Sequence, residues 1–174
     1  MKLGISKASL YPLETEKALD ILGKAGIKRT EIFFNCNYEL KDEFIDLLIR
    51  IKNEYGIEIT SVHPTMSLAE SFMLFSAYDR RLREGLEDFY RYGEICAKLD
   101  AKYVILHGGK PNGILSDEEY CERFMLVNNT VRKGGGELLQ ENVVRFRAGE
   151  LDFLKMMQKN LGDEVGFCLD VKHL

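Results

Sequence analysis

The sequence predicts an α/β fold in which parallel strands alternate with helices that pack outside them. Short β-rich runs alternate five times with segments of helical periodicity, and a sixth such run follows. The length of 174 residues suits one domain with a core of its own. Two architectures fit this alternation: an open doubly wound sheet, and a (β/α)8 barrel that stops short of its eight strands.

Six strands are expected along the chain. They lie at residues 2–6, 30–34, 57–62, 102–107, 137–143 and 165–170. The fourth and the sixth are continuous apolar runs, which is the pattern of a parallel strand that is covered on both faces.

Five helices are expected between the strands, because apolar residues recur there at helical spacing. Their apolar faces span residues 18–25, 44–51, 82–96, 120–131 and 154–161. Ser116 and Glu119 have the spacing of a capping box at the start of the fourth helix. Gly56 is expected to end the second helix, and the glycine run 134–136 the fourth. Residues 64–77 interrupt the rhythm, and this insertion predicts either a functional lid or packing on the rim of the fold.

Composition argues against several classes of protein. Lysine and arginine total 24 and aspartate and glutamate total 28, so the net charge of -4 argues against a nucleic-acid partner. No run approaches the roughly 18 apolar residues of a membrane span. Residues 1–6 do not resemble a signal peptide, and the four cysteines form no C-x-x-C pair. We therefore expect a cytoplasmic protein with free, small buried thiols.

The three histidines carry most of the functional information, because each follows a predicted strand. His63 follows the third strand, His107 ends the fourth, and His173 lies just past the sixth. Parallel α/β folds build their active sites at the carboxyl ends of their strands. We therefore expect the three imidazoles to share one site.

Carboxylates are expected at the same level of the fold. Glu141 ends the fifth strand and Asp170 ends the sixth, although either could instead cap a helix or pair with a lysine. Nitrogen and oxygen ligands without thiolate suit Zn²⁺, Mn²⁺, Fe²⁺ or Co²⁺ better than Ca²⁺. Arg145 and Arg147 follow the fifth strand, where they could contact an anionic substrate or remain solvated.

These residues together resemble the xylose isomerase-like TIM-barrel superfamily, which includes sugar phosphate isomerases/epimerases and the endonuclease IV type of AP endonucleases (family 2). The motifs that carry the resemblance are His63-Pro64, His107-Gly108-Gly109, Glu141-Asn142 and Asp170-x-x-His173. It implies an incomplete (β/α)8 TIM barrel of about six parallel strands and five or more helices. Residues 1–174 would then form one TIM-barrel-like domain that lacks the last two βα units.

The two branches of the superfamily imply different roles for the same residues. In the nuclease branch, His63, His107 and Glu141 would bind one zinc ion. Glu141 would bridge to a second metal together with Asp170, and His173 would bind a third. In the epimerase branch, Glu141 and Asp170 would hold one divalent metal and His173 would contact the substrate. Glu141 would also move a proton beside a carbonyl, as one of two acid/base groups.

The resemblance also implies residues that this chain does not supply. The last two strands of such barrels bring a further metal histidine and the second acid/base glutamate. Three functions therefore stay open. The first is a metal-dependent sugar or sugar-phosphate isomerase/epimerase that uses Zn²⁺ or Mn²⁺, with Mg²⁺ or Co²⁺ as alternatives, and that truncation could leave inactive. The second is an AP endonuclease, and the third is a non-catalytic metal-binding remnant.

A six-stranded part of a barrel leaves its first and last strands unpaired on one side. We expect the chain to bury these edges by forming a homodimer. The expected ligand is a small carbohydrate or sugar phosphate, contacted by His173 and Arg147. No membrane partner is expected.

Overall fold

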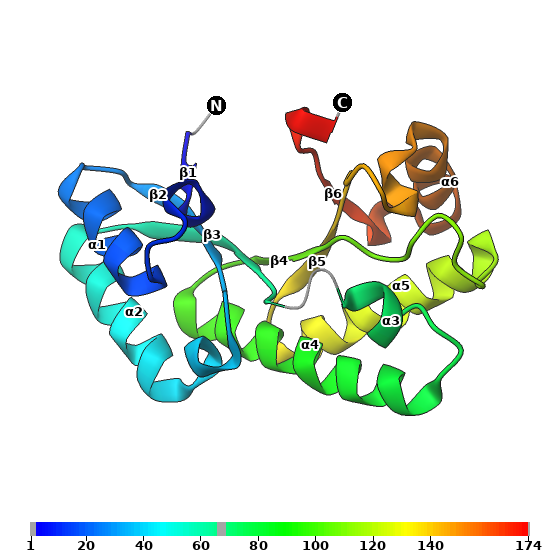
Figure 1. Cartoon of the computed structure of the whole chain (residues 1–174), viewed down its shortest axis with the longest axis horizontal. Coiled ribbons are helices and arrows are strands. Elements are labelled where there is room, and N and C mark those ends of the chain that lie inside the picture. Colours follow the sequence, from blue (N-terminus) through cyan, green and yellow to red (C-terminus); the bar gives the residue numbers. More distant parts are fainter. Residues whose placement is uncertain (1–2, 66–68, 174) are drawn as a thin grey trace.

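The computed structural model describes residues 3–65 and 69–173. One sheet of six strands dominates it, with every neighbouring pair parallel and the strands in sequence order from β1 to β6. This order confirms the predicted α/β class and fits an incomplete α/β barrel, because an open doubly wound sheet reverses its strand order partway. Figure 1 shows the sheet curving, with β1 and β6 on opposite sides of an opening.

The strands begin close to their predicted positions. They are β1 (Ile5–Ser6), β2 (Arg29–Phe33), β3 (Glu58–His63), β4 (Tyr103–Leu106), β5 (Glu137–Glu141) and β6 (Gly166–Cys168). The two edge strands are shorter than the expected ranges 2–6 and 165–170, of which residue 2 lies outside the described residues. Each has a single strand neighbour, so the ladder supports fewer of its residues.

Six helices connect the described strands, and the five longer ones lie on the convex side of the sheet (Figure 1). They are α1 (Thr15–Lys24), α2 (Asp42–Tyr55), α3 (Glu70–Met73), α4 (Asp79–Leu99), α5 (Asp117–Gly134) and α6 (Leu151–Leu161). Short 3₁₀ turns lie between the ends of β1, β2, β5 and β6 and the next helix or the end of the described chain, at Lys7–Leu10, Asn37–Leu40, Arg147–Gly149 and Val171–His173. A fifth, Gly162–Glu164, follows α6. None of the helices in the described ranges is long and apolar enough to cross a membrane.

The helix ends follow the sequence signals. Ser116 and Glu119 form the predicted capping box at the start of α5. Gly56 and Gly135 take positive φ angles of 62° and 109° where α2 and α5 end. A side chain at either position would be strained. Glycine therefore allows the chain to turn back toward the sheet at both helix ends.

The core lies between the helices and the outer face of the sheet. Val104, Leu106 and Leu138 are fully buried there against apolar side chains of the helices, including Phe124 and Val127 of α5. Burial of this apolar surface is the main force that holds the strands in place. The expected helix faces are largely confirmed, but Ile21 in α1 is 43 % exposed.

The insertion 64–77 carries α3 and packs on the fold in its described part. Leu74 and Phe75 are buried, and a Cβ on Gly85 of α4 would lie 2.7 Å from a methyl group of Leu74. Phe72 points outward and is 61 % exposed. Residues 66–68 of the insertion lie outside the described residues.

All four cysteines are free, as predicted. Cys96 and Cys121 are buried and Cys168 is half-buried. Cys36 is exposed, so the expectation that all four are small buried residues is wrong for this one, which lies just before a surface 3₁₀ turn.

Candidate metal centre

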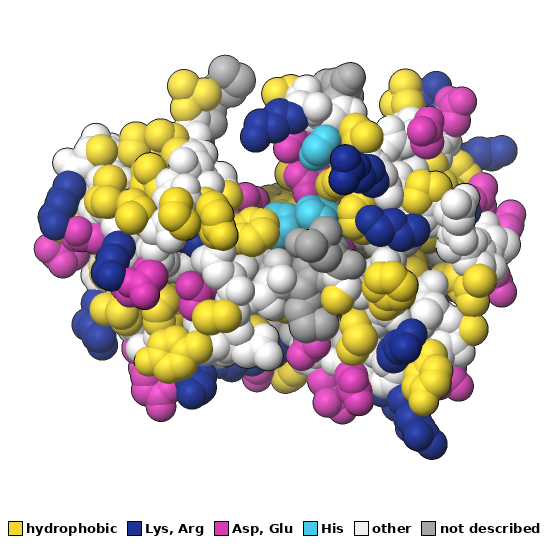
Figure 2. All heavy atoms as spheres, viewed as in Figure 1, with side chains coloured by type: hydrophobic (Ala, Val, Ile, Leu, Met, Phe, Trp, Pro, Cys, Tyr) yellow, Lys and Arg dark blue, Asp and Glu magenta, His cyan; other side chains and the backbone are white. Residues whose placement is uncertain are grey.

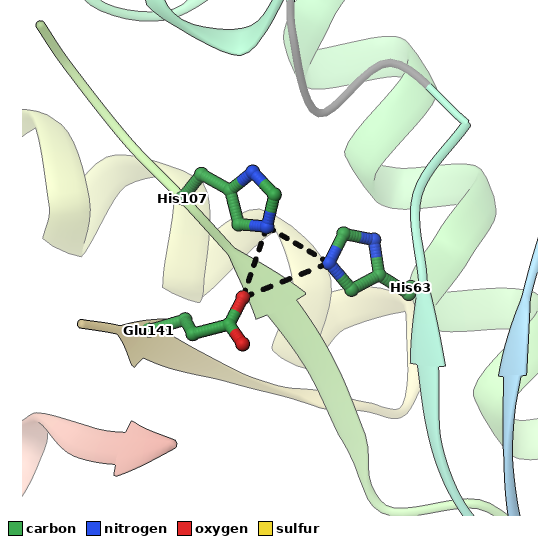
Figure 3. Close-up of side chains that lie close together, drawn as sticks. All are labelled: His63, His107 and Glu141. Carbon is green, nitrogen blue, oxygen red and sulfur yellow. Dashed lines mark hydrogen bonds and ion pairs between the residues drawn. The ribbon is translucent and has the colours of Figure 1, made fainter. Parts of the chain in front are cut away.

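Three of the predicted ligands meet at the carboxyl ends of neighbouring strands. His63 is the last residue of β3, His107 follows β4, and Glu141 is the last residue of β5. Because the three strands are adjacent and parallel, their ends reach the same edge of the sheet. Figure 3 shows both imidazole rings and the carboxylate pointing toward one another.

The distances within this group suit a single metal ion. Glu141 Oε2 lies 2.9 Å from His107 Nε2 and 3.7 Å from His63 Nε2, and the two Nε2 atoms are 3.0 Å apart. One ligand atom from each residue lies within 4.8 Å of the others. Two imidazole nitrogens and a carboxylate oxygen form a donor set that zinc and related divalent ions accept. The His63–His107–Glu141 group therefore fits a metal ion.

Electrostatics of the group favour an ionised carboxylate. Burial opposes the charge on Glu141, but the contacts with His107 and His63 outweigh it and hold the pKa of the carboxyl at about 2. Burial likewise lowers the pKa of His63, but Glu141 and the nearby Glu31 and Glu70 more than offset this and raise it above its usual value. The group is therefore ready to receive a cation in place of a proton.

Packing holds both imidazoles from outside the group. His63 lies against Phe33 with ring centroids 4.4 Å apart, and its Nδ1 is 3.3 Å from the carbonyl oxygen of Pro64. His107 meets the ring of Phe146 edge to face, with centroids 5.3 Å apart. These contacts direct the Nε2 atoms toward Glu141.

Asp170 and His173 line the same cavity but stand apart from the three-residue group. The cavity has a volume of about 350 Å³ and is bordered by all five predicted metal residues. Asp170 Oδ2 lies 3.7 Å from His173 Nε2. Figure 2 shows histidine side chains gathered beside the hollow in this face. The sequence thus identified residues of one cavity, and the described structure brings three of them within reach of a common ion.

Arg147 points away from the cavity. Its guanidinium donates to the carbonyl oxygen of Leu115 at 2.7 Å and pairs with Asp117. It also lies over the ring of Phe153, 4.7 Å from the centroid. These contacts tie the turn after β5 to the start of α5.

Two buried or half-buried carboxyl groups near the centre were missed by the sequence analysis. Glu31 on β2 lines the cavity and accepts hydrogen bonds from Ser6 and Ser61, each at 3.0 Å. Glu70 at the start of α3 is 1 % exposed, and burial raises its pKa to about 8. A charged residue inside an apolar run, as in TEIFF and LAESFM, was the available signal.

The chain was compared with protein families, curated proteins and solved structures. No protein-family model matches the sequence, and no curated protein does. Among solved structures, a D-tagatose 3-epimerase-like protein matches with a TM-score of 0.80 at 19 % identity over 99 % of this chain. 3-Keto-D-glucoside 4-epimerase from E. coli matches with a TM-score of 0.75 at 15 % identity over 99 % of the chain.

An AP endonuclease of family 2 from Brucella melitensis also matches, with a TM-score of 0.73 at 15 % identity over 98 % of the chain. The chain spans 66 %, 69 % and 68 % of the lengths of these three proteins, respectively. At such identities the likeness concerns the backbone arrangement. The chain therefore has the fold of the xylose isomerase-like TIM barrels over about two thirds of their length.

Proposed function

We propose that this chain carries the metal centre of a metal-dependent sugar or sugar-phosphate isomerase/epimerase. The observation that supports it most directly is the convergence of His63, His107 and Glu141 on one point of a cavity of about 350 Å³. A cavity of this size accommodates a small sugar. Solved structures of the same fold include several proteins named as sugar epimerases.

The donor set favours Zn²⁺ or Mn²⁺, with Mg²⁺ or Co²⁺ as alternatives. When bound, such an ion polarises a carbonyl group and acidifies the adjacent C–H bond. Glu141 is the proposed base, because its carboxylate lies beside the two histidines and lines the cavity. We place Asp170, which follows β6, as a further ligand and His173 as a substrate contact.

The proposed substrate contact of Arg147 stays a prediction that needs a rearrangement. Its guanidinium would have to leave Leu115 and Asp117 to reach the cavity. His173 needs no such change, because it already borders the cavity.

An AP endonuclease is the second candidate, and one observation favours it. The resemblance to the nuclease branch implies that His63, His107 and Glu141 together hold one zinc ion, and these residues form the observed group. The net charge of -4 disfavours binding to a phosphate backbone. A non-catalytic metal-binding protein is the third candidate.

Metal content per chain tests the shared premise of all three candidates. We expect about one ion per chain after purification with Mn²⁺ or Zn²⁺, and loss of that ion from a Glu141→Ala variant. Solvent deuterium incorporation into a ketose would then support the isomerase/epimerase, and nicking of abasic DNA the endonuclease. Metal binding without either reaction would support the non-catalytic protein.

We also propose a homodimer formed through the open edges of the sheet. Within the described residues, β1 and β6 each pair with one neighbour only, so each leaves backbone groups on its outer side. Light scattering across micromolar concentrations tests this, and a monomer mass throughout would contradict it. The cytoplasmic location also stays a prediction.

A further inference from the structure

The segment after β3 contacts the turn that carries His107. Glu70, the first residue of α3, uses one carboxyl oxygen, Oε2, to accept two backbone hydrogen bonds. The N–H of His107 donates at 2.7 Å and the N–H of Gly108 donates at 3.0 Å. Both N–H groups lie beyond the last residue of β4, where the sheet ladder has ended. Glu70 therefore supplies the partner that the ladder does not.

The remaining polar groups of this turn are held from its other side. Gln140 of β5 donates from Nε2 to the carbonyl oxygens of Leu106 and His107, each at 3.0 Å. Gly108 has a φ of 86°, and a Cβ there would lie 1.9 Å from the hydroxyl oxygen of Tyr120. The turn is thus closely confined on the side of α5 and β5, and Glu70 closes it on the side of α3.

The two histidines of the metal centre differ in how their rings are held. His63 has a partner for Nδ1 in the carbonyl oxygen of Pro64. The Nδ1 atom of His107 is buried and has no hydrogen-bond partner among the described residues. Metal-bound histidines usually depend on such a second hydrogen bond for their orientation. The direction of the His107 ring must therefore depend more strongly on its backbone, which Glu70 contacts.

We propose that Glu70 is a positioning residue, whose carboxyl group fixes the His107–Gly108 turn and so aims the His107 imidazole at the metal site. This inference rests on the proposed metal centre and adds to it a residue from outside the strand ends. It also assigns a role to the insertion 64–77: its buried residues Leu74 and Phe75 anchor α3, and α3 presents Glu70 to β4.

Three variants test the role of Glu70. Glu70→Ala removes the acceptor. Glu70→Gln keeps one acceptor oxygen at the same chain length, and a single oxygen accepts both bonds in this structure. Phe72→Ala is the matched control, because Phe72 lies in the same helix but is 61 % exposed and is not one of the buried residues that anchor it.

The first measurement is amide hydrogen exchange in the metal-free protein. We expect the amides of His107 and Gly108 to exchange at least about 10-fold faster in Glu70→Ala, and at nearly the wild-type rate in Glu70→Gln and Phe72→Ala. The second is titration with Co²⁺, followed by its visible absorption. We expect Glu70→Ala to weaken Co²⁺ binding by roughly 10–100-fold with an altered spectrum, and Glu70→Gln to stay within about 3-fold of the wild type.

Specific outcomes would overturn the inference. Wild-type Co²⁺ affinity in Glu70→Ala, or an equal loss in Phe72→Ala, would leave Glu70 with a general structural role only. If Glu70→Ala does not fold, Glu70→Asp replaces it. The shorter side chain of aspartate withdraws the acceptor from the turn while keeping the carboxyl group. Undiminished Co²⁺ affinity in Glu70→Asp would overturn the inference. A wild-type protein that binds no Co²⁺ would overturn the proposed metal centre and this inference with it.

Discussion

The ends of the central strands and the end of the edge strand β6 carry similar side chains in different settings. His63 and Glu141 end strands that have neighbours on both sides, and their side chains are 6 % and 12 % exposed. Asp170 and His173 follow a strand of three residues with one neighbour, and their side chains are 31 % and 29 % exposed. The first pair belongs to a group in which His107 Nε2 lies 3.0 Å from His63 Nε2 and 2.9 Å from Glu141 Oε2, whereas the second pair lies outside that group.

The difference shows that a strand end places a residue, while the neighbouring strands decide how firmly it is held. In the centre, β3, β4 and β5 constrain one another, so that little entropy remains to be lost when a ligand binds. In the part of the chain that the structure describes, β6 has β5 as its single strand neighbour, and the chain continues into a 3₁₀ turn. We therefore expect the centre to dominate metal affinity and the edge to modulate substrate contact.

The largest expected effect separates the carboxylates of the cavity. Glu141→Gln should weaken metal binding by more than about 100-fold, beyond the usual loss for residues outside the ligand set. Asp170→Asn should weaken metal binding by about 10-fold or less. Glu31→Gln should leave it nearly unchanged, because Glu31 is hydrogen-bonded to two serines outside the group. Isothermal titration of the three matched variants with Zn²⁺ or Mn²⁺ measures this order. A larger loss in Asp170→Asn than in Glu141→Gln would reverse the comparison between centre and edge.

A second effect concerns the pH dependence of stability in the metal-free protein. The pKa of Glu141 is held at about 2, below the ordinary value of about 4.3. Its contribution is therefore present above pH 4.3 and is lost as the pH falls toward 2. That contribution is on the order of 3 kcal/mol. The raised pKa of His63 acts in the opposite direction, so its contribution is present below about pH 6.5 and is lost as the pH rises through the folded-state pKa.

Urea unfolding of the metal-free protein between pH 2 and 9 measures both limbs. We expect the contribution of this pair to be greatest between about pH 4.3 and 6.5. Glu141→Gln should flatten the acid limb. An acid limb that persists in Glu141→Gln would assign it to carboxylates elsewhere.

Much of the centre was predictable from the sequence because its signals are local. His63, His107 and Glu141 each end a strand whose apolar pattern is strong, and the parallel order then brings them together. The capping box at Ser116 and the glycine at position 135 mark helix ends for the same reason. Each signal depends on a few adjacent residues.

The parts that were missed depend on distant contacts. Glu70 meets His107 across 37 positions of the chain, and no local pattern marks that contact. The shortness of β6 and the 3₁₀ turn after it follow from the number of neighbouring strands, which periodicity does not reveal. The Arg147 side chain is directed away from the cavity because it pairs with Asp117, a residue of another element.

A smaller effect is expected where the centre and the edge are joined. Asn142 follows β5, accepts a hydrogen bond from the N–H of Asp170 at 2.6 Å, and donates to the carbonyl oxygen of Asp170 at 3.1 Å. Asn142→Ala should lower the free energy of unfolding by about 1–2 kcal/mol, because it leaves the partly buried N–H of Asp170 without a partner. Amide exchange at Asp170 should accelerate, while exchange at His107 should not. Acceleration at both would show that the edge and the centre open as one unit.

The smallest effect is expected at His173, where the comparison makes its sharpest distinction. Its side chain is 29 % exposed and lies outside the His63–His107–Glu141 group, so His173→Ala should change the free energy of unfolding by no more than about 0.5 kcal/mol. Metal affinity should stay within about 2-fold of the wild type, since a residue outside the ligand set and its hydrogen-bond partners contributes little to it. If the chain turns over a ketose, KM should rise more than kcat falls. A loss of metal affinity as large as that in Glu141→Gln would instead make His173 a ligand, and the site would then extend across the cavity from the central strands to the edge.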